Sequence, residues 1–422
     1  MMTSMDWKKE VLAKIKPKKE EEAHMDAALT TFIKKLNTVL GDAKAVLGGS
    51  GAKGTWIAGR DEADIFVSFP RDKYADKTDQ ISDILEQHLK RIIKHPDRFH
   101  GSRDYFQVKE GSFTFELVPI IGVKKAQDAL NITDVSPLHA TWVHSHSTQK
   151  IRDDIRIAKA FCKAQNCYGA ESYIRGFSGY VIELLVIHYK SFEKFLKASA
   201  LWEEKQVIDP GKLYRKNESV WTVMSDSKLQ SPVIVVDPVD KSRNAAAALN
   251  KEKLLIFKKS ASHFIKKPSI TFFERDITTI EKLKKRKGKN AALWIEVENI
   301  EAKEDVAGAQ LLLAFDYLKK QLEKFSVISA GWEWDKKQHA SFWLILKTSQ
   351  LPKTEWHKGP PLEMQNAVAD FKKKHKKTVQ KDGRVWAEIK VKYPKVKDRA
   401  KETLNEDYCS TKIKTIKRIE VI

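Results

Sequence analysis

The chain has 422 residues, of which 42% are hydrophobic, so it is long enough for about three domains with apolar cores. Its 77 Lys and Arg residues exceed its 56 Asp and Glu residues, and the formal net charge of +21 indicates a polyanionic partner. Three cysteines are too few for a disulfide framework, and the longest apolar run, at 181–188, is too short to span a bilayer. Composition therefore excludes secreted disulfide scaffolds and membrane-spanning proteins. It predicts a soluble, cytoplasmic protein that has no membrane partner.

The first 145 residues are predicted to alternate between helices and strands. Apolar residues recur at helical spacing over 25–40, and a second helix is predicted over 79–94. Short apolar runs typical of strands occur at 45–47, 65–69 and 113–121. This order is typical of an α/β domain that ends near residue 145.

The rest of the chain divides into a helical part and a basic α+β part. Helices are predicted over 151–164, 176–192 and 244–264. The α+β part that follows has a predicted helix over 307–325 and predicted strands over 293–297, 327–334, 340–346 and 384–391. Residues 351–377 interrupt this pattern with a Gly-Pro-Pro segment followed by a helix, so they are predicted to be an insertion.

Most of the excess positive charge lies in the second part of the chain. Residues 251–422 carry +16 of the +21, concentrated in the runs 282–289 and 372–377. A single lysine run is more often a solvated face than a binding site. Two runs in the same region, with Trp356 and Trp386 nearby, favour binding to a phosphate backbone. The lysines predicted to bind RNA are Lys373, Lys374 and Lys377.

A glycine-rich segment at 49–54 matches the pattern G-x-G-x-x-G, but its surroundings exclude two familiar phosphate-binding folds. A dinucleotide-binding fold needs a helix next and an acid about 20 residues later, whereas Asp64 follows on an immediately adjacent strand. A P-loop needs Gly-Lys-Ser/Thr at its end, and this chain has Lys53-Gly-Thr instead.

A third template, a two-metal phosphoryl-transfer site, fits the same region. Glu62 and Asp64 occupy positions i and i+2 of a strand, so both carboxylates face the same side. Such a pair can bind two divalent cations, and Glu116, inside an apolar strand, is predicted to complete the clamp. The Gly49-Ser50 turn would offer N–H groups and a hydroxyl to a triphosphate. In the alternative structural reading, Glu62 and Asp64 lie in a solvated turn and Glu116 pairs with an arginine.

These motifs resemble the polymerase-β-type nucleotidyltransferases and, more specifically, the archaeal-type (class I) CCA-adding enzymes. The similarity to the head-domain signature runs from Gly49 to Pro70. The segments Arg175-Gly-Phe-Ser-Gly-Tyr180 and Asp237-Pro-Val-Asp-Lys-Ser-Arg243-Asn244 are the most specific, because generic nucleotidyltransferases lack them. The similarity is strong over roughly residues 30–275 and looser beyond them.

The resemblance implies an α+β multidomain protein that adds C, C and A from CTP and ATP to the 3′ end of tRNA without a nucleic-acid template. Its parts would be a nucleotidyltransferase head (1–145), a helical neck (146–266), an RRM-like α+β body (267–348 and 386–422) and an inserted, tRNA-binding tail (349–385). By position, Mg²⁺ would be held by Glu62, Asp64 and Glu116, and the nucleotide by Gly49, Ser50, Lys53, His139, Lys159, Tyr168 and Arg243. Arg243 would help to read the incoming base.

Two positions depart from the family pattern, and two other functions stay open. The family usually has Asp where this chain has Glu116, and Arg is common at the position of Lys53. A poly(A) or oligoadenylate polymerase would share the metal motif but not the two most specific segments. A catalytically silent tRNA-binding protein would need a degraded site. The oligomeric state, a homodimer included, does not follow from the sequence.

Overall fold

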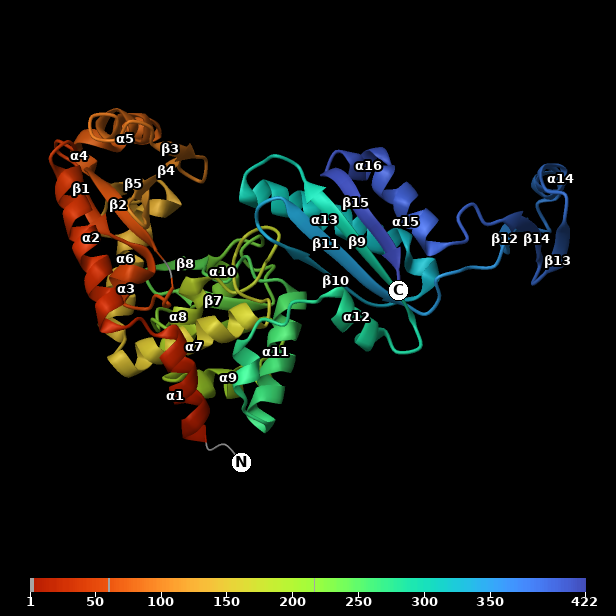
Figure 1. The fold of residues 1–422 in the computed structure, drawn as a ribbon, viewed down its shortest axis with the longest axis horizontal. Coiled ribbons are helices and arrows are strands. Elements are labelled where there is room, and N and C mark those ends of the chain that lie inside the picture. Colours follow the sequence, from red (N-terminus) through yellow and green to blue (C-terminus); the bar gives the residue numbers. More distant parts are fainter. Residues whose placement is uncertain (1–3, 60, 216) are drawn as a thin grey trace. The chain divides into compact units, whose positions relative to one another are not determined.

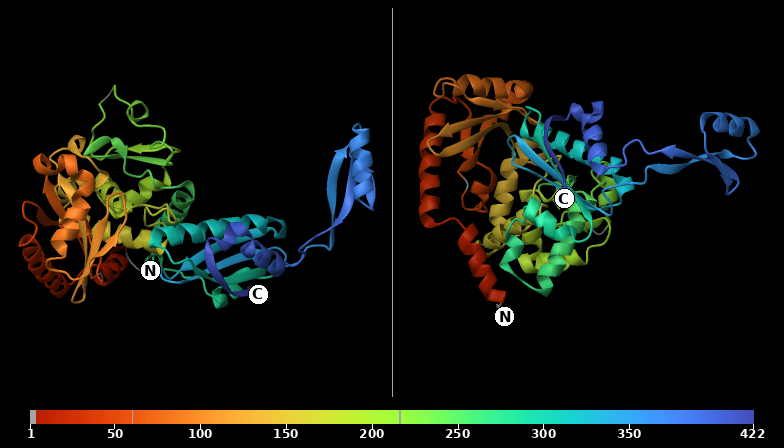
Figure 2. Two further views of the ribbon diagram at one scale, coloured as in Figure 1. Left: turned by 90° about the horizontal axis from the view of Figure 1, so that it is seen from above. Right: turned by 45° about the vertical axis from the view of Figure 1, so that its right-hand side comes forward.

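The computed structural model describes residues 4–59, 61–215 and 217–422, which form two compact units, Met1–Asp276 and Ile277–Ile422. Figures 1 and 2 show the helices and strands of each unit. In the part of the chain that the structure describes, no helix is long and apolar enough to cross a membrane.

The larger unit begins with a helical segment and a five-stranded sheet. The strand order is β1 (Lys44–Leu47), β2 (Glu62–Pro70), β5 (Phe113–Gly122), β4 (Tyr105–Glu110) and β3 (Asp97–Phe99). β2 and β5 are parallel, and the other neighbours are antiparallel. Helices α2 (Lys19–Asn37) and α5 (Ile81–Leu89) bury the apolar face, where the Phe32 and Phe115 rings stack with centroids 4.5 Å apart. The opposite face carries the acidic residues.

Helix α2 shows how the sequence specifies these elements. Its buried residues Met25, Leu29, Phe32 and Leu36 recur at helical spacing. Three glutamates in the first turn and two lysines in the last turn complement the helix dipole, which explains why the helix begins at Lys19, before the predicted start. The predicted strands at 45–47, 65–69 and 113–121 are confirmed, whereas β3 and β4 are additional.

A second core forms among four helices that follow the sheet. These are α7 (Gln149–Ala164), α8 (Gly179–Tyr189), α9 (Phe192–Ala200) and α11 (Lys251–Lys266). The predicted helix over 244–264 begins only at Lys251, because Asn250 caps it and Asn244 ends a strand. Helix α1 (Ser4–Ile15) packs in the same core, with the Trp7 ring centroid 5.0 Å from that of Phe264. Helix α1 therefore packs against the segment predicted as the neck, although it lies within the residues predicted as the head.

Helix α6 (Ser136–His146) connects the sheet to these helices, and a buried ion pair fixes its start. Asp134 is 1% exposed and accepts hydrogen bonds from the backbone N–H groups of Ile121 and Asn131 at 2.9 and 2.8 Å. Arg103 donates to the same carboxylate and to the carbonyl of Pro119. This network holds the beginning of α6 against β5.

Short elements complete the larger unit. A small sheet has the order β6 (Gln206–Ile208), β7 (Val233–Asp237) and β8 (Asp240–Asn244). The short helices are α3 (Gly49–Lys53), α4 (Arg71–Tyr74) and α10 (Val220–Val223), together with 3-10 turns at Ala75–Gln80, Ala126–Asp128, Ile132–Val135 and Ile270–Phe273.

The smaller unit has a four-stranded antiparallel sheet with the order β10 (Val327–Trp334), β11 (His339–Leu346), β9 (Ala291–Asn299) and β15 (Ile413–Val421). Helices α13 (Glu304–Gln321) and α15 (Val396–Asn405) share a core with one face of the sheet. The strands and helices of this unit follow one another along the chain in the order βαββαβ. This is the order of ferredoxin-like proteins, and it fits the predicted RRM-like body. Three short segments are added to this order: α12 (Ile280–Lys287) before β9, a 3-10 turn at Glu323–Phe325 before β10, and α16 (Asp407–Ser410) before β15.

A small sheet and a helix interrupt this body between β11 and α15. The order is β12 (Thr354–Pro361), β14 (Arg384–Lys390) and β13 (Thr378–Lys381), and α14 (Gln365–Lys374) packs on one face. The Gly-Pro-Pro segment lies inside β12 and does not break the structure. Proline is tolerated there because β12 is an edge strand, and its register shifts between Lys358 and Pro361. The sheet continues to Lys390, beyond the predicted boundary at residue 385.

Candidate active site

The acidic residues predicted to bind metal lie on β2 and β5. Glu62 and Asp64 are two residues apart on β2 and therefore point to the same face. In the parallel pairing of the two strands, Asp64 lies opposite Glu116, and Glu62 lies opposite Thr114. The structure thus places Asp64 and Glu116 side by side, whereas Glu62 lies at the exposed start of its strand.

Glu116 is half-buried, so it is not enclosed in the apolar core of its strand. The first six residues of β5 alternate between buried and half-buried, and Glu116 belongs to the half-buried set on the same face as Asp64. Gln107 on β4 donates a hydrogen bond from Nε2 to Glu116 Oε1 at 2.8 Å. A neutral donor orients the carboxylate without neutralising its charge.

Gly49 lies directly against the Asp64 carboxylate. The backbone N–H of Gly48 donates to the carbonyl of Asp64 at 2.8 Å, which holds the start of α3 on β2. Gly49 has φ of 54°, and a Cβ atom at this position would overlap Asp64 Oδ2. Glycine is therefore required here both by its backbone conformation and by the space that the carboxylate occupies. Ser50 follows immediately in the first turn of the helix.

The donors on this face suit a hard divalent cation. Mg²⁺ prefers carboxylate oxygen ligands, and Asp64 and Glu116 present such ligands from adjacent strands. Within the described ranges, no three His, Cys, Asp or Glu side chains are already arranged to hold a metal ion. The chemistry and order of the ligands therefore fit a cation, and binding would require the carboxylates to converge.

The two lysines predicted to contact a triphosphate share one buried carboxylate. Glu183 of α8 is 1% exposed, and its Oε1 accepts hydrogen bonds from Lys159 Nζ at 2.7 Å and Thr55 Oγ1 at 2.6 Å. Its Oε2 lies 2.9 Å from Lys53 Nζ. Burial alone would raise the pKa of Glu183, but the charges of Lys159 and Lys53 lower it to about 2. The carboxylate is therefore ionised at neutral pH and joins both lysines.

A second buried carboxylate, that of Asp237, holds two of the residues predicted to bind the nucleotide. His139 Nε2 is 2.9 Å from Asp237 Oδ2, and Arg243 donates to the same oxygen. Tyr180 donates to Oδ1 at 3.0 Å, and its ring centroid lies 4.2 Å from that of His139. Burial, together with the charges of Arg243 and Lys53, lowers the pKa of His139 below its usual value despite the contact with Asp237, so the imidazole is neutral at pH 7. The structure thus brings His139 and Arg243 together.

Tyr168 lies beside the start of α8, close to Lys159. A Cβ atom added to Gly179, the first residue of α8, would be 2.9 Å from Tyr168 Oη and 3.7 Å from Lys159 Cε. Lys163, one turn further along α7, lies over the Tyr168 ring at 5.0 Å. The two predicted nucleotide ligands from this part of the chain are therefore neighbours.

Three protein-family models match successive parts of the chain. Residues 29–110 match the family described as a nucleotidyltransferase domain, and residues 153–274 match the second domain of tRNA nucleotidyltransferases. Residues 293–418 match the C-terminal domain of CCA-adding enzymes. The CCA-adding enzyme of Nanoarchaeum equitans is 34% identical over 375 residues, which cover 88% of this chain and 90% of that enzyme.

The chain belongs to the CCA-adding enzyme family. The enzyme of Thermococcus gammatolerans is 30% identical over 397 residues, covering 90% of this chain and 85% of the relative. The enzyme of Methanosarcina acetivorans is 29% identical over 420 residues, with 93% of this chain and 87% of the relative covered. The resemblance to archaeal-type CCA-adding enzymes is confirmed.

Solved structures support the fold of a polymerase-β-type nucleotidyltransferase. A crystal structure of the Cid1 poly(U) polymerase has a TM-score of 0.50 and 16% identity, and the match covers 65% of this chain and 100% of that chain. A second Cid1 structure, described for its RNA terminal uridylyl transferase activity, also gives a TM-score of 0.50, with 14% identity and coverage of 65% and 99%. The predicted fold class, an α+β multidomain protein with such a head, is confirmed.

The smaller unit of this CCA-adding enzyme carries two basic surfaces. Lys373, Lys374 and Lys377, predicted to bind RNA, are exposed at and just beyond the end of α14. Lys377 lies over the ring of Trp356, which is 48% exposed, and also pairs with Glu388 at 2.5 Å. Both aromatic and positively charged groups are therefore available on this inserted sheet.

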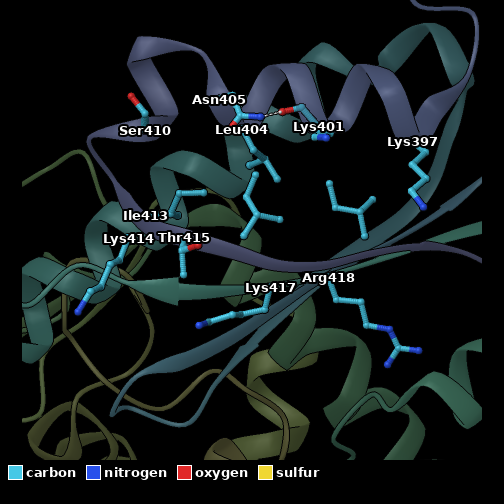
Figure 3. Close-up of a pocket in the computed structure, with 12 residues that line it drawn as sticks. Lys397, Lys401, Leu404, Asn405, Ser410, Ile413, Lys414, Thr415, Lys417 and Arg418 are labelled. Atoms are coloured by element: carbon cyan, nitrogen blue, oxygen red, sulfur yellow. Dashed lines mark hydrogen bonds between the residues drawn. The ribbon is translucent and has the colours of Figure 1, made fainter.

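The other basic surface is a groove of about 480 Å³ between α15 and β15 (Figure 3). It is lined by Lys397 and Lys401 of α15 and by Lys417 and Arg418 of β15, among others. Lys417 is partly neutralised by Glu298, 3.0 Å away on β9. The sequence does not predict this groove, because its residues come from two segments that meet only in the fold.

Four residues that organise the site were not among those predicted: Thr55, Tyr180, Glu183 and Asp237. The sequence contains a signal for three of them. Glu183 interrupts the longest apolar run of the chain, and such an acid is costly to bury unless it is paired. Tyr180 ends one of the two most specific segments, and Asp237 begins the other. None of these signals identifies the partner across the fold.

Proposed function

We propose that this chain adds C, C and A from CTP and ATP to the 3′ end of tRNA by in-line nucleotidyl transfer that releases pyrophosphate. The observation that carries the proposal is near full-length similarity to CCA-adding enzymes, combined with Asp64 and Glu116 side by side under the glycine-rich turn. CTP, ATP and tRNA are accordingly the proposed substrates.

The proposed catalytic residues are Glu62, Asp64 and Glu116, which would hold two Mg²⁺ ions. When bound, these ions neutralise charge on the reacting phosphates and activate the 3′ hydroxyl. Asp64 is positioned for this role by its contact with Gly49, and Glu116 by the hydrogen bond from Gln107. The additional methylene of Glu116, relative to the Asp usual in the family, lengthens its reach from β5.

The proposed nucleotide site lies between the sheet and the helices of the larger unit. Lys53 and Lys159 supply positive charge for the triphosphate, and Gly49, Ser50 and Tyr168 complete its surroundings. His139 and Arg243 lie together at Asp237, and Arg243 is proposed to read the incoming base. A neutral His139 can donate one hydrogen bond and accept another without adding charge.

The proposed tRNA surface includes the inserted sheet with Lys373, Lys374 and Lys377. Exposed lysines beside an exposed tryptophan suit the phosphate backbone and unpaired bases of RNA. We propose the same division of labour as predicted from the sequence, with a catalytic head, a nucleotide-binding neck, a body and a tRNA-binding tail.

Nucleotide incorporation into tRNA that lacks its 3′ terminus tests this function. CTP alone should extend the tRNA by two nucleotides, and CTP with ATP by three, after which addition stops. Long adenylate products from ATP alone would favour a poly(A) or oligoadenylate polymerase instead. Binding of tRNA without any incorporation would favour a catalytically silent protein.

A further inference from the structure

The buried network around Glu183 joins residues that are far apart in the chain. Lys53 lies in the glycine-rich segment 49–54 and Thr55 directly follows it, whereas Lys159 belongs to α7 and Glu183 to α8. Thr55 Oγ1 lies 3.0 Å from Lys159 Nζ and 2.6 Å from Glu183 Oε1, so it contacts both members of the pair. Lys159 is only 3% exposed, and Lys53 is the more accessible lysine, with 11% of its side chain exposed.

We propose that Glu183 is a positioning residue that keeps Lys159 charged and holds it beside Lys53, so that the nucleotide triphosphate meets two fixed positive charges. This inference rests on the proposed function, because it assigns the two lysines to the triphosphate. Glu183 acts through the lysines and does not itself touch the substrate. With two ammonium groups and one carboxylate, the network keeps a net charge of +1.

The need for Glu183 follows from the burial of Lys159. An enclosed ammonium group loses its hydration, and without a nearby anion its pKa falls by several units. Burial lowers the pKa of Lys159 below its usual value, and Glu183 offsets only part of this shift. Lys53 and Arg156, the cations that face Lys159, lower its pKa further. Two phenols lie nearby, those of Tyr168 and Tyr180. Burial raises the pKa of Tyr180, so its phenol stays neutral.

The positions of Lys53 and Lys159 suit the binding of a phosphate chain. The start of α8 brings Gly179, Tyr168 and Lys159 together, as the space around Gly179 shows. Lys53 comes from the segment that also carries Gly49 and Ser50, which begins beside Asp64. A charged pair at this point therefore connects the carboxylate face of the sheet with the helical part of the site.

The variant Glu183→Gln tests this inference through the pH dependence of ATP binding in the absence of tRNA. Loss of the anion should lower the pKa of Lys159 further, so that the variant's lysine loses its proton at a lower pH than the wild-type lysine does. Between about pH 6 and pH 9, the ratio of the variant's ATP dissociation constant to that of wild type should therefore rise by about tenfold, the order expected for one charge-assisted hydrogen bond. Glu183→Asp, which keeps the charge, should show at most a small part of this trend.

Glu193→Gln is the matched control, because Glu193 of α9 also pairs with a lysine but is 40% exposed. Its ATP affinity should follow that of wild type at every pH. A ratio for Glu183→Gln that does not change with pH would reduce Glu183 to a structural anchor and overturn the inference. Tighter ATP binding at every pH would also overturn it, because Glu183 would then compete with the phosphates.

A second comparison applies if Glu183→Gln does not fold. Lys159→Met removes the buried charge, so adding Glu183→Gln to it should weaken ATP binding by less than about threefold. A further loss of tenfold or more would show that Glu183 acts independently of Lys159 and would contradict the inference. ATP binding is measured without tRNA, whereas the proposed function is tested by the products that wild type makes from tRNA. The two proposals can therefore fail independently of each other.

Discussion

Gly49→Ala should inactivate the enzyme while leaving it folded. The added Cβ atom would overlap Asp64 Oδ2, so the carboxylate has to move away from its place opposite Glu116. A displacement of about 1 Å in a catalytic group can lower the rate about 100-fold. The positive φ of Gly49 adds a cost in folding stability of about 1 kcal/mol for any residue with a side chain. Incorporation of CMP into truncated tRNA measures the first effect, and thermal unfolding measures the second.

The variant Gly41→Ala separates the two effects expected of Gly49→Ala, on activity and on stability. Gly41 has nearly the same backbone conformation, with φ of 61°, and nothing lies within 4 Å of the position of its Cβ atom. This variant should lose a similar amount of stability and keep its incorporation rate. If Gly41→Ala is as inactive as Gly49→Ala, backbone strain alone explains the loss. Normal incorporation by a folded Gly49→Ala would show that the Asp64 carboxylate need not stay where the structure places it.

Three further predictions concern the third carboxylate, the inserted sheet and the buried acid near the base. Glu116→Asp should retain activity, and Glu116→Gln should lose most of it; equal activity of wild type and Glu116→Gln would leave a site of two carboxylates. Charge reversal at Lys373, Lys374 and Lys377 should weaken tRNA binding and lower its salt slope by a few units, at about 0.7–0.9 per phosphate contact, with a much smaller effect on an acceptor-stem substrate. An acceptor stem affected as strongly as whole tRNA would place these lysines near the active site. Burial would raise the pKa of Asp237, but His139 and Arg243 hold it below the usual value. The ionised Asp237 therefore stabilises the folded state at neutral pH, and this contribution is lost as the pH falls. Asp237→Asn should therefore lower the melting temperature most at neutral pH, and the difference from wild type should shrink below about pH 4; a constant difference would contradict this reasoning.

The parts of the fold that the sequence predicted have long and regular apolar patterns. The strand cores of β2 and β5 and the helices α7 and α8 were predicted within a few residues, because each contains a run of mostly buried residues whose length distinguishes helix from strand. β3 and β4 were not predicted, because they are short and mix polar with apolar residues. The Gly-Pro-Pro segment was interpreted as a break, although it forms part of an edge strand.

The candidate site was only partly predictable, for a different reason. Glu62 and Asp64 were found from their local spacing on one strand, and Glu116 was found as an acid inside an apolar strand. The structure places Asp64 opposite Glu116. Glu183 and Thr55 are separated by 128 residues, so no local pattern could pair them. The roles of the predicted residues stay predictions until they are measured, whereas their positions follow from the fold.

Single-turnover addition of CMP by Asp64→Ala, compared with wild type on tRNA that lacks its 3′ terminus, tests the central claim most directly. Loss of a metal-binding carboxylate should remove several kcal/mol of transition-state stabilisation, and so lower the rate by about three orders of magnitude or more. Affinity for tRNA should stay within about threefold of wild type, because the proposed RNA-binding lysines lie in the other unit. Near-normal CMP addition by this variant would contradict the assignment of catalysis to the carboxylates of β2 and β5.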